Sequence, residues 1–216
     1  MRESPASPFR VVPHPAGEQG EASVESADKV LARAAAGGDV VATRRLLERV
    51  APRMLRAVRA VLGPAHADVD DVLQQALIGL VQALPSYRGE CEPVHFGARI
   101  AVRAAMAARK RARAAWARRD DGADADAVVD LAPRPDDDAR EARRRAVVRG
   151  LLEQISEEQA ETMALRFMLG WSLEDVAQAT GAPLNTVRSR LRLAKEALKK
   201  RIDADPVLRE ELEVDP

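Results

Sequence analysis

The sequence predicts an all-α protein of two small helical domains joined by a flexible acidic linker, the second domain carrying a helix-turn-helix. Alanine, leucine and arginine dominate the 216 residues and aromatic residues make up only 3%, which favours helices over a β-sandwich. Apolar residues recur at helical spacing in both halves of the chain. Between the halves lies an Asp-rich stretch with Pro133 and Pro135 and no sustained periodicity, which is typical of a tether.

The first domain is placed at residues 26–117 and is expected to contain four helices. Residues 1–25, with four prolines, are expected to be a disordered leader. The predicted helices run from about Ser26 to Gly37, from Val40 to Leu62 with a break or kink at Pro52, from Asp68 to Leu84, and from Val94 towards Trp116. The third helix has an apolar stripe for its inner face: Val72, Leu73, Ala76, Leu77, Leu80 and Val81.

Charge is strongly segregated along the chain, although 34 basic and 34 acidic residues give a formal net charge of zero. Residues 93–119 contain eight Arg or Lys and no acidic residue, whereas residues 120–138 contain eight Asp and one Arg. The fourth helix is therefore expected to show a basic outer face suited to nucleic acid, followed by an acidic linker at residues 118–141. Such a tether should leave few contacts between the domains.

The second domain, at residues 142–203, ends in three helices whose start and stop signals are clear. Capping boxes are predicted at Ser156 and at Ser172, Gly181 should end the second of the three helices, and Asn185 is expected to cap the third. The third helix has an apolar stripe of Val187, Leu191, Ala194 and Leu198. Residues 204–216 are expected to form a short acidic tail.

A support helix, a tight turn and a basic helix follow the plan of a helix-turn-helix, whose second helix enters the major groove of DNA. The candidate DNA-reading residues open that helix: Asn185, Thr186, Arg188, Ser189, Arg190 and Arg192. An ordinary amphipathic helix with a solvated charged face is the simpler alternative. The agreement of turn, caps and basic face in one place favours DNA reading.

Catalytic and metal chemistry find no support in the sequence. Cys91 is the only cysteine, and no group of Cys and His residues has metal-ligand spacing. Adjacent Asp70 and Asp71 have no second carboxylate or histidine group for acid–base work. No apolar run is long enough for a membrane span, and the N-terminus lacks a signal-peptide core. We therefore expect a cytoplasmic protein without cofactors and without enzymatic activity.

Local motifs resemble those of bacterial extracytoplasmic-function (ECF) sigma factors over about residues 26–202. The resemblance is carried by the segment DDVLQQ at residues 70–75, the loop LPSYRGE at residues 84–90, and the segment from Ser156 to Leu198 with its TVRSRL core. It implies a promoter-specificity subunit that binds core RNA polymerase, promoter DNA and an anti-sigma factor. The implied polymerase-binding residues are Asp70, Asp71, Gln74 and Gln75.

The resemblance also implies that the first domain captures the −10 promoter element, while the helix-turn-helix reads the −35 element. The implied −10 residues are Tyr87, Arg88, Phe96, Arg99, Arg103, Arg109 and Lys110. Tyr87 beside Arg88 is expected to be an exposed aromatic residue on which an unstacked base could lie. The chain departs from the family pattern at Phe96, where Trp is usual, at Gly97, where Leu is usual, and at Arg103 and Ala107.

Two other functions fit parts of the sequence. A helix-turn-helix regulator that binds DNA without polymerase would need only the second domain, and a core-polymerase pull-down separates it from a sigma factor. A nucleic-acid enzyme with a basic helical domain is disfavoured because no nucleophile–base pair or metal-ligand set accompanies the basic helix.

Overall fold

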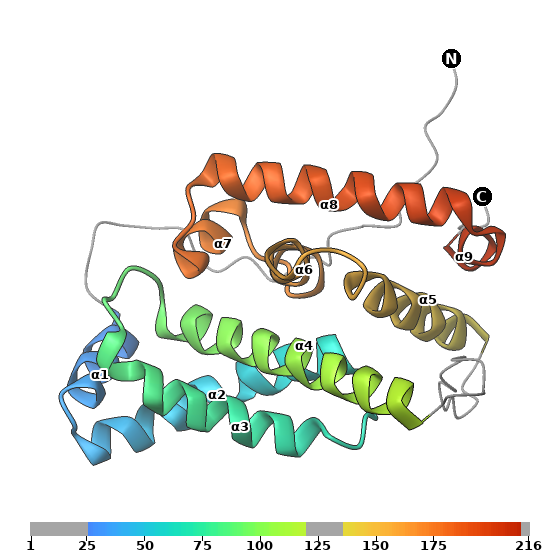
Figure 1. Ribbon diagram of the computed structural model, residues 1–216. Helices are drawn as coiled ribbons and strands as arrows, with labels where there is room; N and C mark the ends of the chain where they lie inside the picture. Colours follow the sequence, from blue (N-terminus) through green and yellow to red (C-terminus); the bar gives the residue numbers. More distant parts are fainter. Residues whose placement is uncertain (1–25, 120–135, 213–216) are drawn as a thin grey trace.

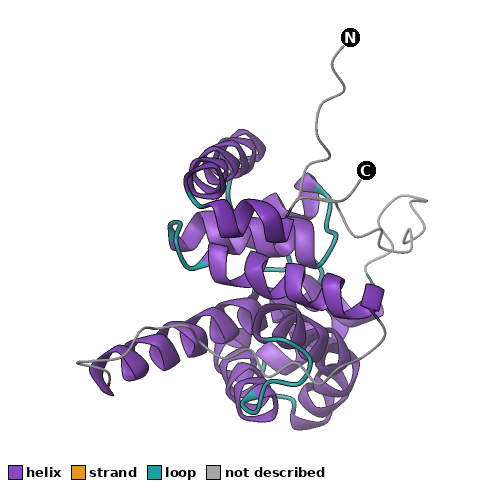
Figure 2. Ribbon diagram, turned by 90° about the vertical axis from the view of Figure 1, so that its right-hand side faces the viewer, coloured by secondary structure: helices purple, strands orange, loops and turns teal. Residues whose placement is uncertain are grey.

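A computed structural model describes residues 26–119 and 136–212. Within these ranges every regular element is a helix or a helical turn, and Figure 2 shows helices joined by short loops. The all-α prediction is thereby confirmed. The predicted leader, most of the predicted linker and the end of the predicted tail lie outside the described residues.

Four helices form an N-terminal bundle. They are α1 (Ala27–Ala36), α2 (Val40–Leu62), α3 (Val69–Ala83) and α4 (Pro93–Arg119), with a 3₁₀ turn η1 (Leu84–Ser86) after α3. The long helix α4 packs against both α2 and α3, and α1 packs against α2, η1 and α4 (Figure 1). The apolar stripes predicted for these helices face this common core, except that Val81 of α3 is exposed rather than buried.

The ends of these helices follow from local sequence. The Ser26 hydroxyl accepts a hydrogen bond from the Lys29 amide, and the Asp39 carboxylate accepts bonds from the amides of Val41 and Ala42. The sequence predicted a break or kink at Pro52, and the structure shows no break, because α2 continues through this residue. Pro52 lies on the exposed side of the helix, where water can reach the carbonyl group that loses its amide partner.

Gly97 allows α4 to lie close to α2 and α3. A Cβ atom at this position would meet the Met54 sulfur at 3.2 Å and the Leu80 Cδ2 atom at 3.5 Å. Gly97 therefore explains one departure from the family pattern, because a leucine here would need space that the side chains of α2 and α3 already fill.

The C-terminal bundle contains α5 (Asp136–Leu152), α6 (Glu157–Met163), a π-helical turn η2 (Ala164–Met168), α7 (Leu173–Thr180), α8 (Leu184–Ala204) and α9 (Pro206–Leu212). Helix α5 begins inside the stretch that the sequence assigned to the linker. Helix α9 occupies part of the predicted tail and buries Leu212, which is only 5% exposed. Both helices thus extend the second bundle beyond residues 142–203.

Capping boxes open α6 at Ser156 and α7 at Ser172, as predicted. Gly181 ends α7 with φ of 65°, a left-handed conformation that glycine adopts without a steric penalty. The predicted cap of α8 is wrong. Helix α8 begins at Leu184 after Pro183, with no side-chain cap, so Asn185 lies within the first turn rather than before it.

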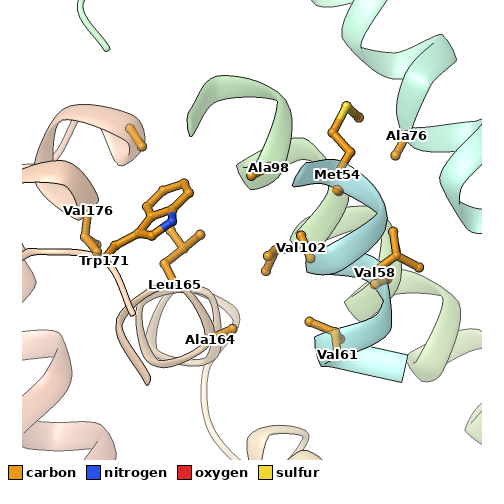
Figure 3. Close-up of a cluster of buried hydrophobic side chains, with 14 of the residues drawn as sticks. Met54, Val58, Val61, Ala76, Ala98, Val102, Ala164, Leu165, Trp171 and Val176 are labelled. Atoms are coloured by element: carbon orange, nitrogen blue, oxygen red, sulfur yellow. The ribbon is translucent and has the colours of Figure 1, made fainter. Parts of the chain in front are cut away.

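The two bundles pack against each other, which the tether had not led us to expect. Helix α4 contacts α6, η2 and α7, and α2 contacts η2. Figure 3 shows Leu165 and Trp171 of the C-terminal bundle directed towards Ala98 and Val102 of α4. All four of these side chains are buried, so the two apolar cores join into one cluster.

Candidate nucleic-acid interface

Helix α8 lies along the outer edge of the C-terminal bundle and presents one face to solvent (Figure 1). Val187, Leu191, Ala194 and Leu198 are buried against α6 and α7, as the sequence predicted. Among the candidate DNA-reading residues, Asn185, Arg188, Ser189 and Arg192 are exposed, whereas Thr186 and Arg190 are half-buried at its edge. The arrangement brings the exposed four onto one side of the first two turns, where a helix can enter the major groove.

Two arginines of this face are oriented by neighbours on the same helix. Arg188 donates from Nη1 to the Asn185 Oδ1 atom at 3.3 Å, and Arg192 donates from Nη1 to the Glu196 Oε1 atom at 2.7 Å. Leu193 lies next to Arg192 and is 44% exposed, which places an apolar side chain on a polar surface. Sequence reasoning had not included Leu193 or Glu196 in this face. Helical spacing could have indicated both, because Leu193 follows Ser189 by four residues and Glu196 follows Arg192 by four.

The candidate polymerase-binding residues form an exposed strip on α3. Asp70, Asp71, Gln74 and Gln75 are all exposed, and the strip continues into Ile78 and Val81, which are exposed apolar residues. The Gln75 Oε1 atom accepts a hydrogen bond from Arg111 of α4 at 3.2 Å. Polar residues that continue into apolar ones resemble the composition of protein–protein interfaces.

The loop before α4 is packed rather than open. The Tyr87 hydroxyl donates to the Cys91 carbonyl at 2.5 Å, and the Tyr87 ring lies 5.2 Å from the Phe96 ring. Tyr87 is therefore half-buried, contrary to the expectation of an exposed aromatic, whereas Arg88 is exposed. Cys91 is buried under this loop, and burial raises the pKa of its thiol above the ordinary value.

Six basic residues of α4, from Arg99 to Arg113, divide into two groups. Lys110 and Arg111 are exposed, and so is Trp116 further along the same helix, at 56%. The arginines of the second group face the C-terminal bundle. We call this second group, Arg99, Arg103, Arg109 and Arg113, the arginine row.

Three glutamates spaced four residues apart, Glu153, Glu157 and Glu161, form an acidic row opposite the arginine row. The pairs are Arg99 with Glu161 at 2.8 Å, Arg103 with Glu157 at 3.8 Å, Arg109 with Glu153 at 2.5 Å, and Arg113 with Glu153 at 3.3 Å. Glu161 is only 5% exposed, so its carboxylate has exchanged most of its water for Arg99. Helix α4 therefore has the predicted basic face, but much of that face lies against carboxylates of the C-terminal bundle and not against solvent.

Two further contacts reinforce this junction. His95 of α4 lies against the Trp171 ring at 4.4 Å between ring centres, and its Nδ1 atom is 3.8 Å from the Asp175 carboxylate. Arg149 of α5 lies close to Gly63 at the end of α2. Burial, with the neighbouring charges of Arg109 and then Arg145, lowers the pKa of Arg149 to about 10. Arg149 of the C-terminal bundle and Arg109 of the N-terminal bundle thus repel each other. Glu153, four residues after Arg149 in the sequence, supplies the negative charge that pairs with Arg109.

The described part of the chain offers neither a metal-binding cluster nor a membrane-spanning helix. No three His, Cys, Asp or Glu side chains in it gather where they could hold a metal ion. None of its helices is both long enough and apolar enough to cross a membrane.

Comparison with known sequences decides the family. Residues 46–118 match the family described as Sigma-70 region 2, and residues 145–198 match Sigma-70, region 4. The ECF RNA polymerase sigma factor SigD of Mycobacterium tuberculosis is 32% identical over 190 residues, which cover 83% of this chain and 85% of SigD. The chain belongs to the ECF RNA polymerase sigma factors.

A second sequence relative agrees with this membership, and a solved structure shows the same fold. The ECF RNA polymerase sigma-E factor of Escherichia coli is 28% identical over 87% of this sigma factor and 99% of the relative. The solved structure described as CnrH in complex with the cytosolic domain of CnrY shares the fold, with a TM-score of 0.52 and 23% identity over 83% of this chain and 99% of CnrH. The two sigma regions correspond to the two bundles, α4 ending the first and α8 lying in the second.

Proposed function

We propose that this sigma factor binds core RNA polymerase through α3 and directs it to promoters that it reads with α8 and α4. Family membership supports the general function, because ECF RNA polymerase sigma factors are subunits that give polymerase its promoter preference. The observation that carries the proposal is the presence of both sigma regions in one chain, each folded as a helical bundle with an exposed polar surface.

The −35 element would be read by the exposed face of α8. Asn185, Ser189 and Arg192 can reach base edges from the first turns of the helix, and Arg188 can pair with a guanine or a phosphate. Leu193 adds an apolar surface of the kind that contacts a thymine methyl group. Thr186 and Arg190, at the edge of the face, are placed to contact the DNA backbone.

The −10 element would be bound by α4 and the loop before it. Arg99, Arg103, Arg109 and Lys110 supply positive charge, and Arg88 extends the surface onto the loop. Tyr87 and Phe96 lie against each other under that loop, so a base could stack on them only if the loop moved. The polymerase contact would use Asp70, Asp71, Gln74 and Gln75, together with the neighbouring Ile78 and Val81. An anti-sigma factor is the partner expected to control this activity.

A regulator that acts without polymerase has less support, because it would not need the region-2 bundle. Core-polymerase pull-down with the full chain, followed by run-off transcription, tests the proposal. We expect the chain to bind core polymerase and to start transcription at a defined set of promoters. A chain that binds DNA but never binds core polymerase would support the free regulator and reject the proposal.

A further inference from the structure

The arginine row on α4 already binds anionic oxygen atoms, and they belong to the same chain. Arg99 uses Nε for the Glu161 carboxylate and Nη1 for the carbonyl of Ala179 at the end of α7. Arg109 directs both Nε and Nη2 to Glu153. Guanidinium groups bind carboxylates and phosphates with the same forked geometry, so these donors are engaged as a nucleic-acid backbone would engage them.

The two rows run in opposite directions and match over the length of the contact. As the residue number rises along α4 from Arg99 to Arg113, its partner falls from Glu161 through Glu157 to Glu153. Such matching requires a row of three carboxylates, not a single chance pair. The C-terminal bundle therefore presents α4 with a line of negative charges, which is also what one strand of DNA presents.

We propose that the acidic row of Glu153, Glu157 and Glu161 is an intramolecular competitor of promoter DNA for the arginine row of α4. The proposal rests on the −10 contact of α4 in the proposed function. While the bundles are in contact, the guanidinium groups of Arg99 and Arg109 are occupied and half-buried. DNA can use them only when the C-terminal bundle moves away.

We call the contact between the two bundles closure. Closure and DNA binding are then thermodynamically linked, and the linkage is reciprocal. If closure weakens DNA binding by some factor, DNA weakens closure by the same factor. The apolar contact of Trp171 and Leu165 with Ala98 and Val102 favours closure in the absence of other partners. The charged rows decide which ligand competes with closure, because only a polyanion can replace three carboxylates at once.

A chemical cross-link can report closure in the full-length chain. Arg103 and Glu157 are the most exposed pair, 3.8 Å apart, and Arg103→Lys supplies an amine that a water-soluble carbodiimide can couple to the Glu157 carboxylate. The coupled peptides are then counted by mass spectrometry. In this background, Glu153→Gln with Glu161→Gln removes two charges of the acidic row and leaves Glu157 as the reporter.

Glu158→Gln with Glu174→Gln is the matched control. Both glutamates are exposed in the C-terminal bundle, and the control changes the net charge by the same amount without touching the acidic row. Glu153→Gln alone provides a second test variant, because Glu153 is at the edge of the contact and its replacement does not alter a fully buried position. Far-UV circular dichroism checks that every variant is folded.

Binding is measured with a promoter fragment that carries the −10 element and lacks the −35 element. We expect the acidic-row variants to lose most of the cross-link and to bind this fragment about tenfold more tightly than the control, within the range usual for coupled sites. Their affinity should also fall more steeply with salt, by up to about 0.9 in the logarithmic slope for each arginine released, because carboxylates no longer neutralise the row beforehand. DNA should in turn reduce the cross-link in the parent chain.

An unchanged cross-link in both acidic-row variants would overturn the proposal, because these carboxylates would not hold the bundles together. Loss of the cross-link with no gain in DNA affinity over the control would also overturn it, because closure and DNA would not compete. Neither result would contradict the proposed sigma-factor function. That function fails a separate test if the parent chain gives no run-off transcript with core polymerase.

Discussion

Arg99 of α4 and Glu161 of α6 form an ion pair across the contact between the two bundles, with 2.8 Å between Nε and Oε1. The same guanidinium donates to the Ala179 carbonyl at 3.0 Å, one residue before the end of α7. One side chain thus joins α4 of region 2 to the helix on each side of the π-helical turn in region 4. Because Glu161 is buried, the pair affects both stability and domain arrangement.

Replacement of Arg99 by methionine should lower the free energy of unfolding by about 3–5 kcal/mol, since it leaves a desolvated carboxylate without its cation. Arg99→Met with Glu161→Met should restore most of this loss, because two apolar side chains can fill the same space. Urea titration of both variants measures the difference. Arg103→Met is the control, because its exposed pair at 3.8 Å should contribute no more than about 1 kcal/mol. Equal losses for Arg99→Met and Arg103→Met would contradict this account.

Much of the fold follows from local sequence. Capping and periodicity rules find features that depend only on residues close together in the sequence. Such features are the capping boxes at Ser156 and Ser172, the helix end at Gly181 and the apolar stripe of α8. The errors arise where local signals are weak or overridden. Pro52 is tolerated on an exposed helix face, and Asn185 is displaced from the cap because α8 begins two residues earlier than an Asn185 cap would require.

The contact between the bundles could not be predicted in this way. Arg99 and Glu161 are 62 residues apart in the sequence. A helix rich in basic residues, such as α4, is equally typical of a DNA-binding surface. The sequence therefore identifies which residues carry charge but not which charges meet. The acidic row could have been noticed as three glutamates spaced by four residues, although that spacing alone is common on solvated helices.

Gly97 should not tolerate a large side chain. Gly97→Leu forces atoms into the space held by Met54 and Leu80 and should destabilise the protein by about 1–3 kcal/mol. Gly150→Leu is the matched control, because a Cβ atom at this helical glycine meets nothing within 4 Å. That change should be neutral or stabilising, since leucine has the higher helix propensity. Thermal melts compare the two, and an unchanged melting temperature for Gly97→Leu would mean that the helices separate at little cost.

Cys91 should react slowly and make stability depend on pH in the alkaline range. Its buried thiol has a pKa raised in the folded state, so above the ordinary thiol pKa the folded chain keeps a proton that the unfolded chain has lost. Stability should therefore fall as pH rises through that window, and Cys91→Ala should reduce the fall. Urea titrations at several pH values test this, and a disulfide reagent at pH 8 should modify the thiol far faster in urea than in buffer. Equal modification rates in both would show that the Tyr87 loop does not cover the thiol.

Arg188→Ala should weaken binding to a −35 fragment by about 1–3 kcal/mol if Arg188 pairs with a guanine. The melting temperature should hardly change, because Arg188 is exposed and its hydrogen bond to Asn185 is a local contact within the same helix. Footprinting and thermal melts on the same preparation separate the two effects. Arg201→Ala, at the far end of the same helix, removes an equal charge and should change binding much less. If both variants lose affinity equally, Arg188 contributes charge but no base contact.

Asp71→Arg should abolish binding to core polymerase, because it reverses a charge near the start of the exposed strip on α3. Asp71 is exposed and lies in the first turn of the helix, where a negative side chain also interacts favourably with the helix dipole. The dipole effect is worth about 0.3–1 kcal/mol at an exposed site, which is too little to unfold the bundle, so loss of binding with an intact circular dichroism spectrum would identify a contact. Glu48→Arg is the control, an exposed charge reversal on α2 away from the strip. A pull-down in which Asp71→Arg still retains polymerase, while the parent chain binds normally, would move the polymerase contact off α3 and leave the strip without a partner.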